Sequence, residues 1–343
     1  MLALCAFLAC LAPMASTAAT PTPKETEPPG LTSGQLANRS FLVSTPKGSG
    51  FARYFGNGSL DGSPTAKRAI IIVHGVLRNA DTYFATGELV LKSAHATDTL
   101  LIAPQFVEAG DLKDHHVPAA TLRWSDDWAG GSPALAPAPI STYSVFDAML
   151  ERLADRKLFP SLTSIVVVGH SAGGQIVQRY AVVGNGPSLV ANGGVHVHLI
   201  VANPSSYLYF GDQRPYSKKD CAGYEHWRYG FVGVPPYVDL TPAAYEQRFV
   251  ARDVTYLLGT ADTNPREWDL DTSCAAEAQG PYRFARGKAY AAYLKGRHPQ
   301  GTTQDIAFVP GVGHDNQKMF TSACGIAVIF DRPRTGCSLA QKI

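Results

Sequence analysis

The hydrophobic positions follow two different patterns along the chain. In residues 39–46 and 51–60 they mark two strands, joined by a glycine-rich turn at residues 47–50. From residue 69 onward, the apolar positions form short continuous runs instead, many of them rich in β-branched residues. Such runs are typical of parallel strands that are buried on both faces of a sheet. The runs that we interpret as strands are residues 69–73, 100–103, 164–168, 199–202, 254–258 and 306–309.

Helix-compatible stretches lie between several of these strands. They are residues 144–156, 173–183, 285–294 and 315–320. Strands and helices in alternation predict an α/β fold with a doubly wound, mostly parallel sheet.

Two segments interrupt this alternation, at residues 107–140 and 205–251. Long insertions after parallel strands lie at the carboxyl edge of the sheet, where ligands bind. We interpret the second segment as a cap-like insertion. The alternative is an insertion that only covers the core.

The amino-terminal residues differ from the rest of the chain. Residues 1–19 contain no Lys, Arg, Asp or Glu, and an apolar run at 2–11 is followed by small residues. This pattern predicts a signal peptide cleaved near Ala19, and therefore a secreted or periplasmic protein, although no basic residue precedes the run. The alternatives are a lipoprotein signal at Cys10 and a buried amino-terminal helix. The run is too short to span a bilayer, so we expect no integral membrane segment in the mature chain.

The remaining chain has the composition of a folded domain. Hydrophobic residues make up 45% of the 343 residues and charged residues 17%, which permits a sizeable core. Residues 20–36, rich in Pro, Thr, Glu and Gly, predict a flexible lead-in to a single domain at residues 37–343. The formal net charge of +2 gives no reason to expect nucleic acid or an anionic membrane as a partner.

Four cysteines remain outside the predicted signal peptide. An even number in an exported chain predicts two disulfides, although the sequence leaves three connectivities open. We favour Cys221 with Cys274 and Cys324 with Cys337, because the second pair is close in sequence and the first flanks the candidate acid. The alternative is four free thiols.

A candidate nucleophile follows the strand at residues 164–168. The sequence Gly169-His170-Ser171-Ala172-Gly173 has the form G-x-S-x-G, and an apolar helical stretch comes next. A sharp turn between strand and helix exposes the serine hydroxyl in strained backbone geometry, and the glycines permit the close approach. The strand–turn–helix context favours Ser171 as a nucleophile over an ordinary turn.

A serine nucleophile needs a base, and the base needs a carboxylate that fixes its orientation. His314 lies in a Gly-Val-Gly-His turn directly after the last predicted strand, so we predict it as the base. Asp262 follows the strand at residues 254–258 and is the predicted acid, with Asp269 and Asp271 as rivals in the same loop.

The oxyanion formed during acyl transfer requires hydrogen-bond donors. The backbone N–H of Ala172 directly follows the nucleophile and is one predicted donor. Val76, in the loop after the strand at residues 69–73, is the other, with Leu77 as its rival. No histidine or cysteine spacing resembles a zinc site, and the chemistry needs no cofactor.

Substrate contacts are harder to assign. Trp124 and Trp128 lie in the first insertion, and we predict that their rings form one wall of the substrate pocket. Tyr207, at the start of the second insertion, is a third candidate for substrate binding. The alternative for the tryptophans is ordinary core packing.

These motifs together resemble those of the α/β-hydrolase superfamily. His74-Gly75, the Ser171 turn, Gly259-Thr260-Ala261-Asp262 and Gly313-His314 occur in the family's order, and the resemblance covers residues 69–320. Residues 201–207 and 309–315 also resemble a group of exported hydrolases.

The resemblance implies acyl transfer to water through Ser171, His314 and Asp262, on a small-molecule or polymeric ester. The alternatives are a secreted peptidase or amidase with the same triad, and an inactive hydrolase-like domain that only binds.

Overall fold

Nine strands form one sheet in the computed structural model, which describes residues 23–28, 32–113, 115–217 and 219–343. The predicted signal peptide and Cys10 lie outside the described residues. The strands are β1 Arg39–Thr45, β2 Gly48–Gly56, β3 Arg68–Val73, β4 Thr99–Gln105, β5 Ser164–His170, β6 His196–Ala202, β7 Asp253–Gly259, β8 Asp305–Val309 and β9 Leu339–Lys342.

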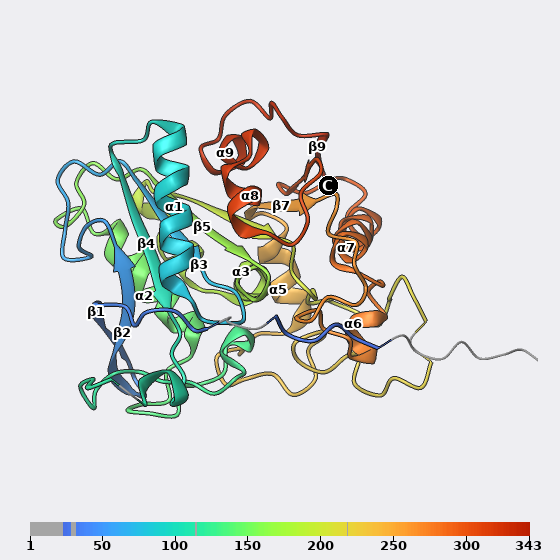
Figure 1. The fold of residues 1–343 in the computed structure, drawn as a ribbon, viewed down its shortest axis with the longest axis horizontal. Coiled ribbons are helices and arrows are strands. Elements are labelled where there is room, and N and C mark those ends of the chain that lie inside the picture. Colours follow the sequence, from blue (N-terminus) through green and yellow to red (C-terminus); the bar gives the residue numbers. More distant parts are fainter. Residues whose placement is uncertain (1–22, 29–31, 114, 218) are drawn as a thin grey trace, which may run out of the picture.

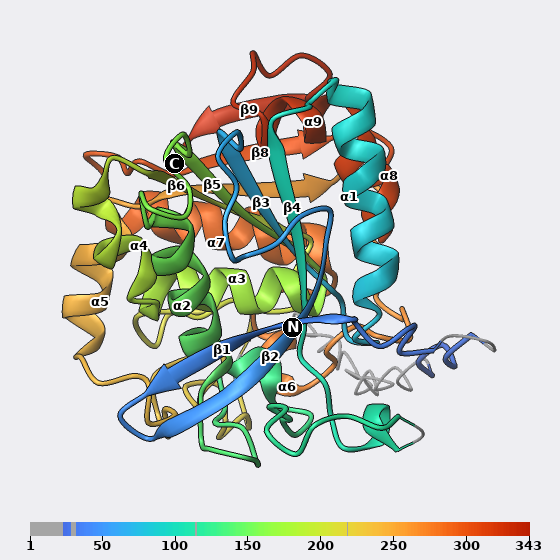
Figure 2. The ribbon, with the colours of Figure 1, turned by 90° about the vertical axis from the view of Figure 1, so that its left-hand side faces the viewer.

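The sheet order is β1-β2-β4-β3-β5-β6-β7-β8-β9, as Figures 1 and 2 show. The strands from β4 to β8 pair in parallel, whereas β1 and β2 at one edge and β9 at the other pair antiparallel. The prediction of a mostly parallel α/β sheet is therefore confirmed. The carboxyl ends of the central strands meet at one edge, where we expected the chemistry.

Helices cover both faces of the sheet. In Figures 1 and 2, α1, α8 and α9 lie on one face and α2, α3, α5 and α7 on the other. Among the described residues, no helix combines the length and hydropathy that crossing a membrane requires. The helices are α1 Ala80–Ala94, α2 Thr142–Ala154, α3 Ala172–Val183, α4 Gly186–Leu189, α5 Pro242–Phe249, α6 Cys274–Glu277, α7 Arg283–Arg297, α8 Asn316–Thr321 and α9 Ala323–Ile329, with 3-10 turns at Gly110–Leu112, Trp128–Gly130 and Ala191–Gly193.

Burial on both sides explains the continuous apolar runs. In β3, Ile70 and Ile72 pack into the cluster under α1, α8 and α9, whereas Ile71 and Val73 pack into the cluster on the opposite face. Each residue of such a strand meets a helix layer, so polar positions do not alternate with apolar ones.

The aromatic insertion packs into the core. Only 1% of Trp124 and 2% of Trp128 is exposed. The indole Nε1–H of Trp124 donates to the Ile140 carbonyl at 3.0 Å, and the Trp128 ring stacks on Phe106 at 5.6 Å between centroids. The prediction that both rings form a wall of the substrate pocket is therefore wrong. Burial beneath the insertion removes more of each apolar ring from water than a position in a solvent-facing wall would.

The described part of the predicted lead-in lies against a loop near the carboxyl edge. Lys24 Nζ donates to the Leu270 carbonyl at 2.7 Å, and the Glu25 amide donates to the Arg266 carbonyl at 2.8 Å. Residues 24 and 25 are therefore tied to the loop that follows Asp262.

Two disulfides join the cysteine pairs that the sequence favoured. Cys221 pairs with Cys274, with 5.7 Å between Cα atoms, and Cys324 pairs with Cys337, with 4.7 Å. The first attaches the second insertion to the start of α6, and the second attaches α9 to the segment that leads into β9.

The core position of Trp128 generates a stability prediction. Trp128→Ala should lower the free energy of unfolding by about 3–5 kcal/mol, because it leaves a cavity between Phe106 and His74. Leu135→Ala in the same insertion is the control, since Leu135 is 69% exposed and its truncation should change stability by less than about 0.5 kcal/mol. Urea unfolding measures both, and equal midpoints for Trp128→Ala and the wild type would contradict the core assignment.

The disulfide pairing is open to direct mapping. Peptides from the non-reduced protein should contain the Cys221–Cys274 and Cys324–Cys337 cross-links, and none of these four cysteines should be alkylated under native conditions. The double variant Cys324→Ala and Cys337→Ala should lose about 3 kcal/mol of stability, because the bridge closes a short loop in the unfolded chain. Any other cross-link among the four cysteines would disprove the pairing.

Candidate active site

Ser171 sits in a strained turn between β5 and α3. Its backbone has φ 59° and ψ −125°, a conformation that non-glycine residues rarely adopt. A Cβ atom on Gly169 would lie 2.1 Å from the Gly173 carbonyl oxygen, and one on Gly173 would lie 2.4 Å from that of Val73. Only glycine fits at these two positions, and the turn therefore has the geometry that the G-x-S-x-G motif predicts.

The predicted base and acid lie in adjacent turns and contact each other. His314 follows β8 and Asp262 follows β7, two strands that pair in parallel. His314 Nδ1 and Asp262 Oδ2 are 2.8 Å apart, and Asp262 is 2% exposed. With Nδ1–H donating to the carboxylate, the Nε2 atom of His314 faces the side on which Ser171 lies.

A buried asparagine holds these turns together, and sequence reasoning assigned it no role. Asn203 directly follows β6 and is fully buried, with φ 43°. Its Oδ1 accepts from the Gly259 amide at 2.9 Å, and its Nδ2 donates to the Gly313 carbonyl at 3.3 Å. The side chain therefore positions both the loop that carries Asp262 and the turn that carries His314.

The loop with the predicted oxyanion donor Val76 borders the nucleophile. A cavity beside Ser171 is lined by Gly75, Val76 and Leu77. Ala172, the other predicted donor, begins α3 directly after the nucleophile. Val76 therefore shares a cavity with Ser171, and Ala172 adjoins Ser171 in the chain; their roles as oxyanion donors stay predictions.

A neutral histidine, His74, fixes the loop that carries Val76. His74 Nδ1–H donates to the Gly75 carbonyl at 2.9 Å, and its Nε2 accepts from the Phe106 amide at 3.1 Å. Burial lowers the pKa of His74 to about 4, so the ring is neutral and makes both bonds. The Trp128 ring lies 4.6 Å from His74 between centroids and supports it.

Asp269, considered only as a rival acid, lies on the opposite side of His314. Its Oδ2 atom is 3.3 Å from His314 Nε2 and 3.4 Å from Ser171 Oγ. Its Oδ1 accepts from Arg283 Nη2 at 2.6 Å. Asp262 therefore occupies the acid's position at Nδ1, and Asp269 lies between the base and the nucleophile.

Arg283 connects the two aspartates from a fully buried position. It is the first residue of α7, and its Nη1 atom is 3.7 Å from Asp262 Oδ1. Its Nε–H donates to Ser205 Oγ at 3.1 Å. The sequence offered no signal for this residue, because a helix-terminal arginine normally faces solvent.

The charges at this site shift the pKa values of His314 and Asp269, the two side chains beside Ser171. Burial and the Arg283 charge lower the pKa of His314, but hydrogen bonds to Asp262 and Asp269 outweigh them and raise it above its usual value. Burial raises the pKa of Asp269, but His314 and Arg283 outweigh it and hold the pKa well below its usual range. The two carboxylates therefore stabilise the charged form of His314 relative to that of a free histidine.

The cavity beside Ser171 has a volume of about 380 Å³. Glu267, Trp268 and Asp269 form its acidic side, and no described residue of either insertion belongs to its lining. Tyr207 lies elsewhere: it is fully buried and stacks on Tyr290 at 4.6 Å, so the candidate assignment of Tyr207 to substrate binding is corrected to core packing. Trp268 and Tyr83 are aromatic residues that line the cavity instead.

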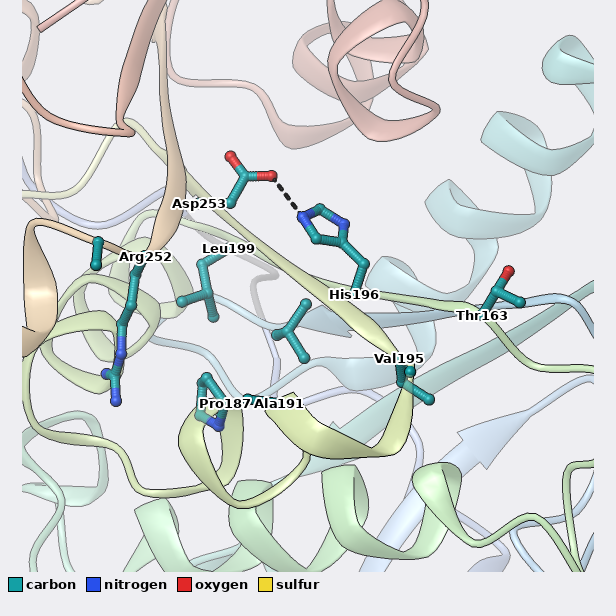
Figure 3. A pocket seen from close by; sticks show the side chains of 11 residues that line it. Thr163, Pro187, Ala191, Val195, His196, Leu199, Arg252 and Asp253 are labelled. Carbon is teal, nitrogen blue, oxygen red and sulfur yellow. Dashed lines mark ion pairs between the residues drawn. The ribbon is translucent and has the colours of Figure 1, made fainter.

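A larger cavity of about 470 Å³ lies at the opposite edge of the sheet, near the starts of β6 and β7 (Figure 3). His196 and Asp253 form an ion pair of 3.1 Å there. Arg252 donates to the Tyr180 and Ala181 carbonyls, near the end of α3, and so serves the fold. Among the described residues, no group of three His, Cys, Asp or Glu side chains is arranged to hold a metal ion.

Comparisons with known proteins bear on the fold. No protein-family model matches the chain, and no curated protein matches it significantly. The structure is similar to that of LpqC, a poly(3-hydroxybutyrate) depolymerase from Bordetella parapertussis, with a TM-score of 0.60 and 22% identity over 88% of this chain and 93% of that one. It is also similar to poly(aspartic acid) hydrolase-1 from Sphingomonas sp. KT-1, with a TM-score of 0.56 and 20% identity over 82% of this chain and 95% of that one. Together with the sheet order and the strained serine turn, these likenesses show that the chain has the α/β-hydrolase fold.

Proposed function

We propose that the protein is a serine hydrolase that cleaves carboxylic esters through an acyl-enzyme on Ser171. One observation carries the proposal: a serine in a strained strand–helix turn shares a cavity with His314, which Asp262 binds at 2.8 Å through Nδ1. Acyl transfer needs a nucleophile, a base and an orienting carboxylate, and the Nδ1 contact supports the pairing of base and carboxylate. The contact between Ser171 Oγ and His314 Nε2 is part of the proposal.

In the proposed first step, Ser171 Oγ attacks the ester carbonyl carbon while His314 Nε2 takes the hydroxyl proton. The backbone N–H groups of Val76 and Ala172 stabilise the oxyanion. His314 then returns the proton to the departing alcohol oxygen, and the C–O bond breaks. Asp262 stays ionised and stabilises the imidazolium throughout.

In the second step, water replaces the alcohol. His314 Nε2 takes a proton from water as its oxygen attacks the acyl carbon, and the proton passes to Ser171 Oγ when the acyl bond breaks. A carboxylic acid leaves, and the serine is restored. Both steps require a free position next to His314 Nε2.

An ester fits this site better than an amide, because an amine leaving group needs stronger protonation than an alcohol does. The two similar structures do not distinguish the two bonds, because one protein is named for a polyester and the other for a polyamide, poly(aspartic acid). There are two alternatives: a peptidase or amidase on the same triad, and an inactive binding domain. The tests below separate both from the proposal.

We further propose that the protein acts outside the cytoplasm, secreted or in the periplasm. The two disulfides are typical of oxidising compartments. The apolar run and small residues within positions 1–19 fit a signal peptide.

Loss of the nucleophile should remove activity without removing the fold. Ser171→Ala should lower kcat for p-nitrophenyl esters by about 10⁴-fold or more, because the hydroxyl that would form the acyl-enzyme is removed. Ser161→Ala, an exposed serine before β5, is the matched control and should retain activity.

A fluorophosphonate probe should label the wild type but not Ser171→Ala, which separates an enzyme from an inactive domain. Aminoacyl anilides tested beside the p-nitrophenyl esters separate a peptidase from an esterase. Near-normal esterase activity in folded Ser171→Ala would refute the assignment.

The ionisation of His314 should set the acid limit of activity. The base must be neutral to accept a proton, and its pKa is raised by Asp262 and Asp269 against the effect of burial. We therefore expect kcat/KM to fall as the pH drops through a value above the ordinary histidine value of about 6.5. A pH–rate profile whose acid limb lies below that value would contradict the raised pKa.

A further inference from the structure

The carboxylate of Asp269 stands where the leaving group must stand. The departing oxygen is bonded to the carbon that Ser171 Oγ attacks, and it receives its proton from His314 Nε2. It must therefore lie near both atoms at once. Asp269 Oδ2 holds that position, 3.4 Å from Oγ and 3.3 Å from Nε2, so Asp269 and a reacting substrate exclude each other.

The charges around this position are unbalanced when His314 is neutral, which is the form that the proposed reaction requires. His314 faces Asp262 at Nδ1, Asp269 at Nε2 and His170 across its ring at 4.4 Å. Arg283 pairs with Asp269 behind it, and Glu267 lies in the same cavity wall. With neutral His314, Asp262 and Asp269 face only the Arg283 cation and leave one net negative charge in a poorly solvated site, so a cation is favoured beside Asp269 when it leaves His314.

Once Asp269 leaves His314, it finds a new partner in the space outside Ser171 only if the substrate supplies one. The cavity is lined by the carboxyl groups of Glu267 and Asp269 and by the Trp268 ring, and no Lys or Arg belongs to its described lining. Carboxylates next to an aromatic face attract an ammonium group. An ester with a cation on its alcohol side would therefore give Asp269 a new partner when it leaves His314.

We propose that Asp269 determines substrate specificity: it occupies the leaving-group position and yields it preferentially to esters whose alcohol carries a positively charged amino or quaternary ammonium group. This inference rests on the proposed function, and it adds no bond-making step to that reaction. The ammonium group pairs with Asp269 and Glu267, while the ester bond is cleaved as described above.

Two butyrate esters of nearly equal shape test the proposal. In the choline ester and the 3,3-dimethylbutyl ester, a quaternary nitrogen and a quaternary carbon occupy the same position, so that they differ chiefly in charge. The wild type should cleave the choline ester with a kcat/KM about tenfold higher, measured at low salt and above the acid limb. Equal values, or a preference for the neutral ester, would overturn the proposal.

Variants of Asp269 test whether this carboxylate causes the preference for the choline ester. Asp269→Asn should bring the ratio of the two kcat/KM values close to one and should move the acid limb to lower pH, because one of the two anions that stabilise the imidazolium is gone. Asp269→Glu, which keeps the charge beside Arg283, should keep the preference and covers the case in which Asp269→Asn fails to fold. Asp98→Asn, a surface carboxylate paired with Lys67, is the control for net charge and should leave the ratio unchanged. An unchanged ratio in folded Asp269→Asn would overturn the assignment.

Failure of the proposed function gives a different result. If the protein is not a serine hydrolase, neither ester is cleaved and a fluorophosphonate does not label Ser171. If labelling occurs but butyrate is a poor acyl group, methylphosphonates with the same two alcohols measure the same selectivity through the rate of Ser171 modification. A faster reaction with the choline phosphonate supports the proposal, and equal rates reject it.

Discussion

The buried guanidinium of Arg283 is the constraint on which the candidate site depends. A fully buried cation must be paired, and its partners here come from two segments: Asp262 and Asp269 from the loop after β7, and Ser205 from the segment after β6. The pairing brings the start of α7, the loop after β7 and the segment after β6 together behind Ser171. Removing either aspartate alone leaves part of that charge uncompensated, so the positions of acid, base and Asp269 are coupled rather than independent.

The sheet could be predicted because burial on both faces leaves a local signal. All eight strands that we predicted exist, since each contributes a continuous apolar run or a turn-bounded strand near the amino end. β9 was missed because Leu339–Lys342 is short and mostly exposed, and it forms only by pairing with β8. α1 was also missed: Gly87 weakens its helical pattern, yet the glycine lets the helix approach Leu101, which a Cβ atom would meet at 2.6 Å.

The candidate triad could be located for a similar reason, since each member follows a strand directly and parallel strands bring such turns to one edge. The catalytic roles of Ser171, Asp262 and His314 stay predictions, but their contacts agree with them. The relation of Asp269 to Ser171 could not be predicted, because it depends on a salt bridge to a residue on another element. Nor could the sequence decide whether Trp124 and Trp128 line a pocket or the core, because both environments favour large aromatic rings.

Trp124 and Trp128 belong to the core and not to the predicted pocket wall, but their packing still affects the active-site edge of the sheet. Trp128 supports the neutral ring of His74, and that ring donates to the carbonyl of Gly75, next to the predicted oxyanion donor Val76. Arg78 holds the other end of this turn, because its amide also donates to Gly75 and its side chain pairs with Asp111 and Glu108. The first insertion therefore fixes the backbone of the loop that carries Val76, while Glu267, Trp268 and Asp269 line the cavity beside Ser171. In the proposed function, oxyanion stabilisation and substrate selection then depend on different segments, so the acidic loop can change without disturbing the support of the Val76 loop.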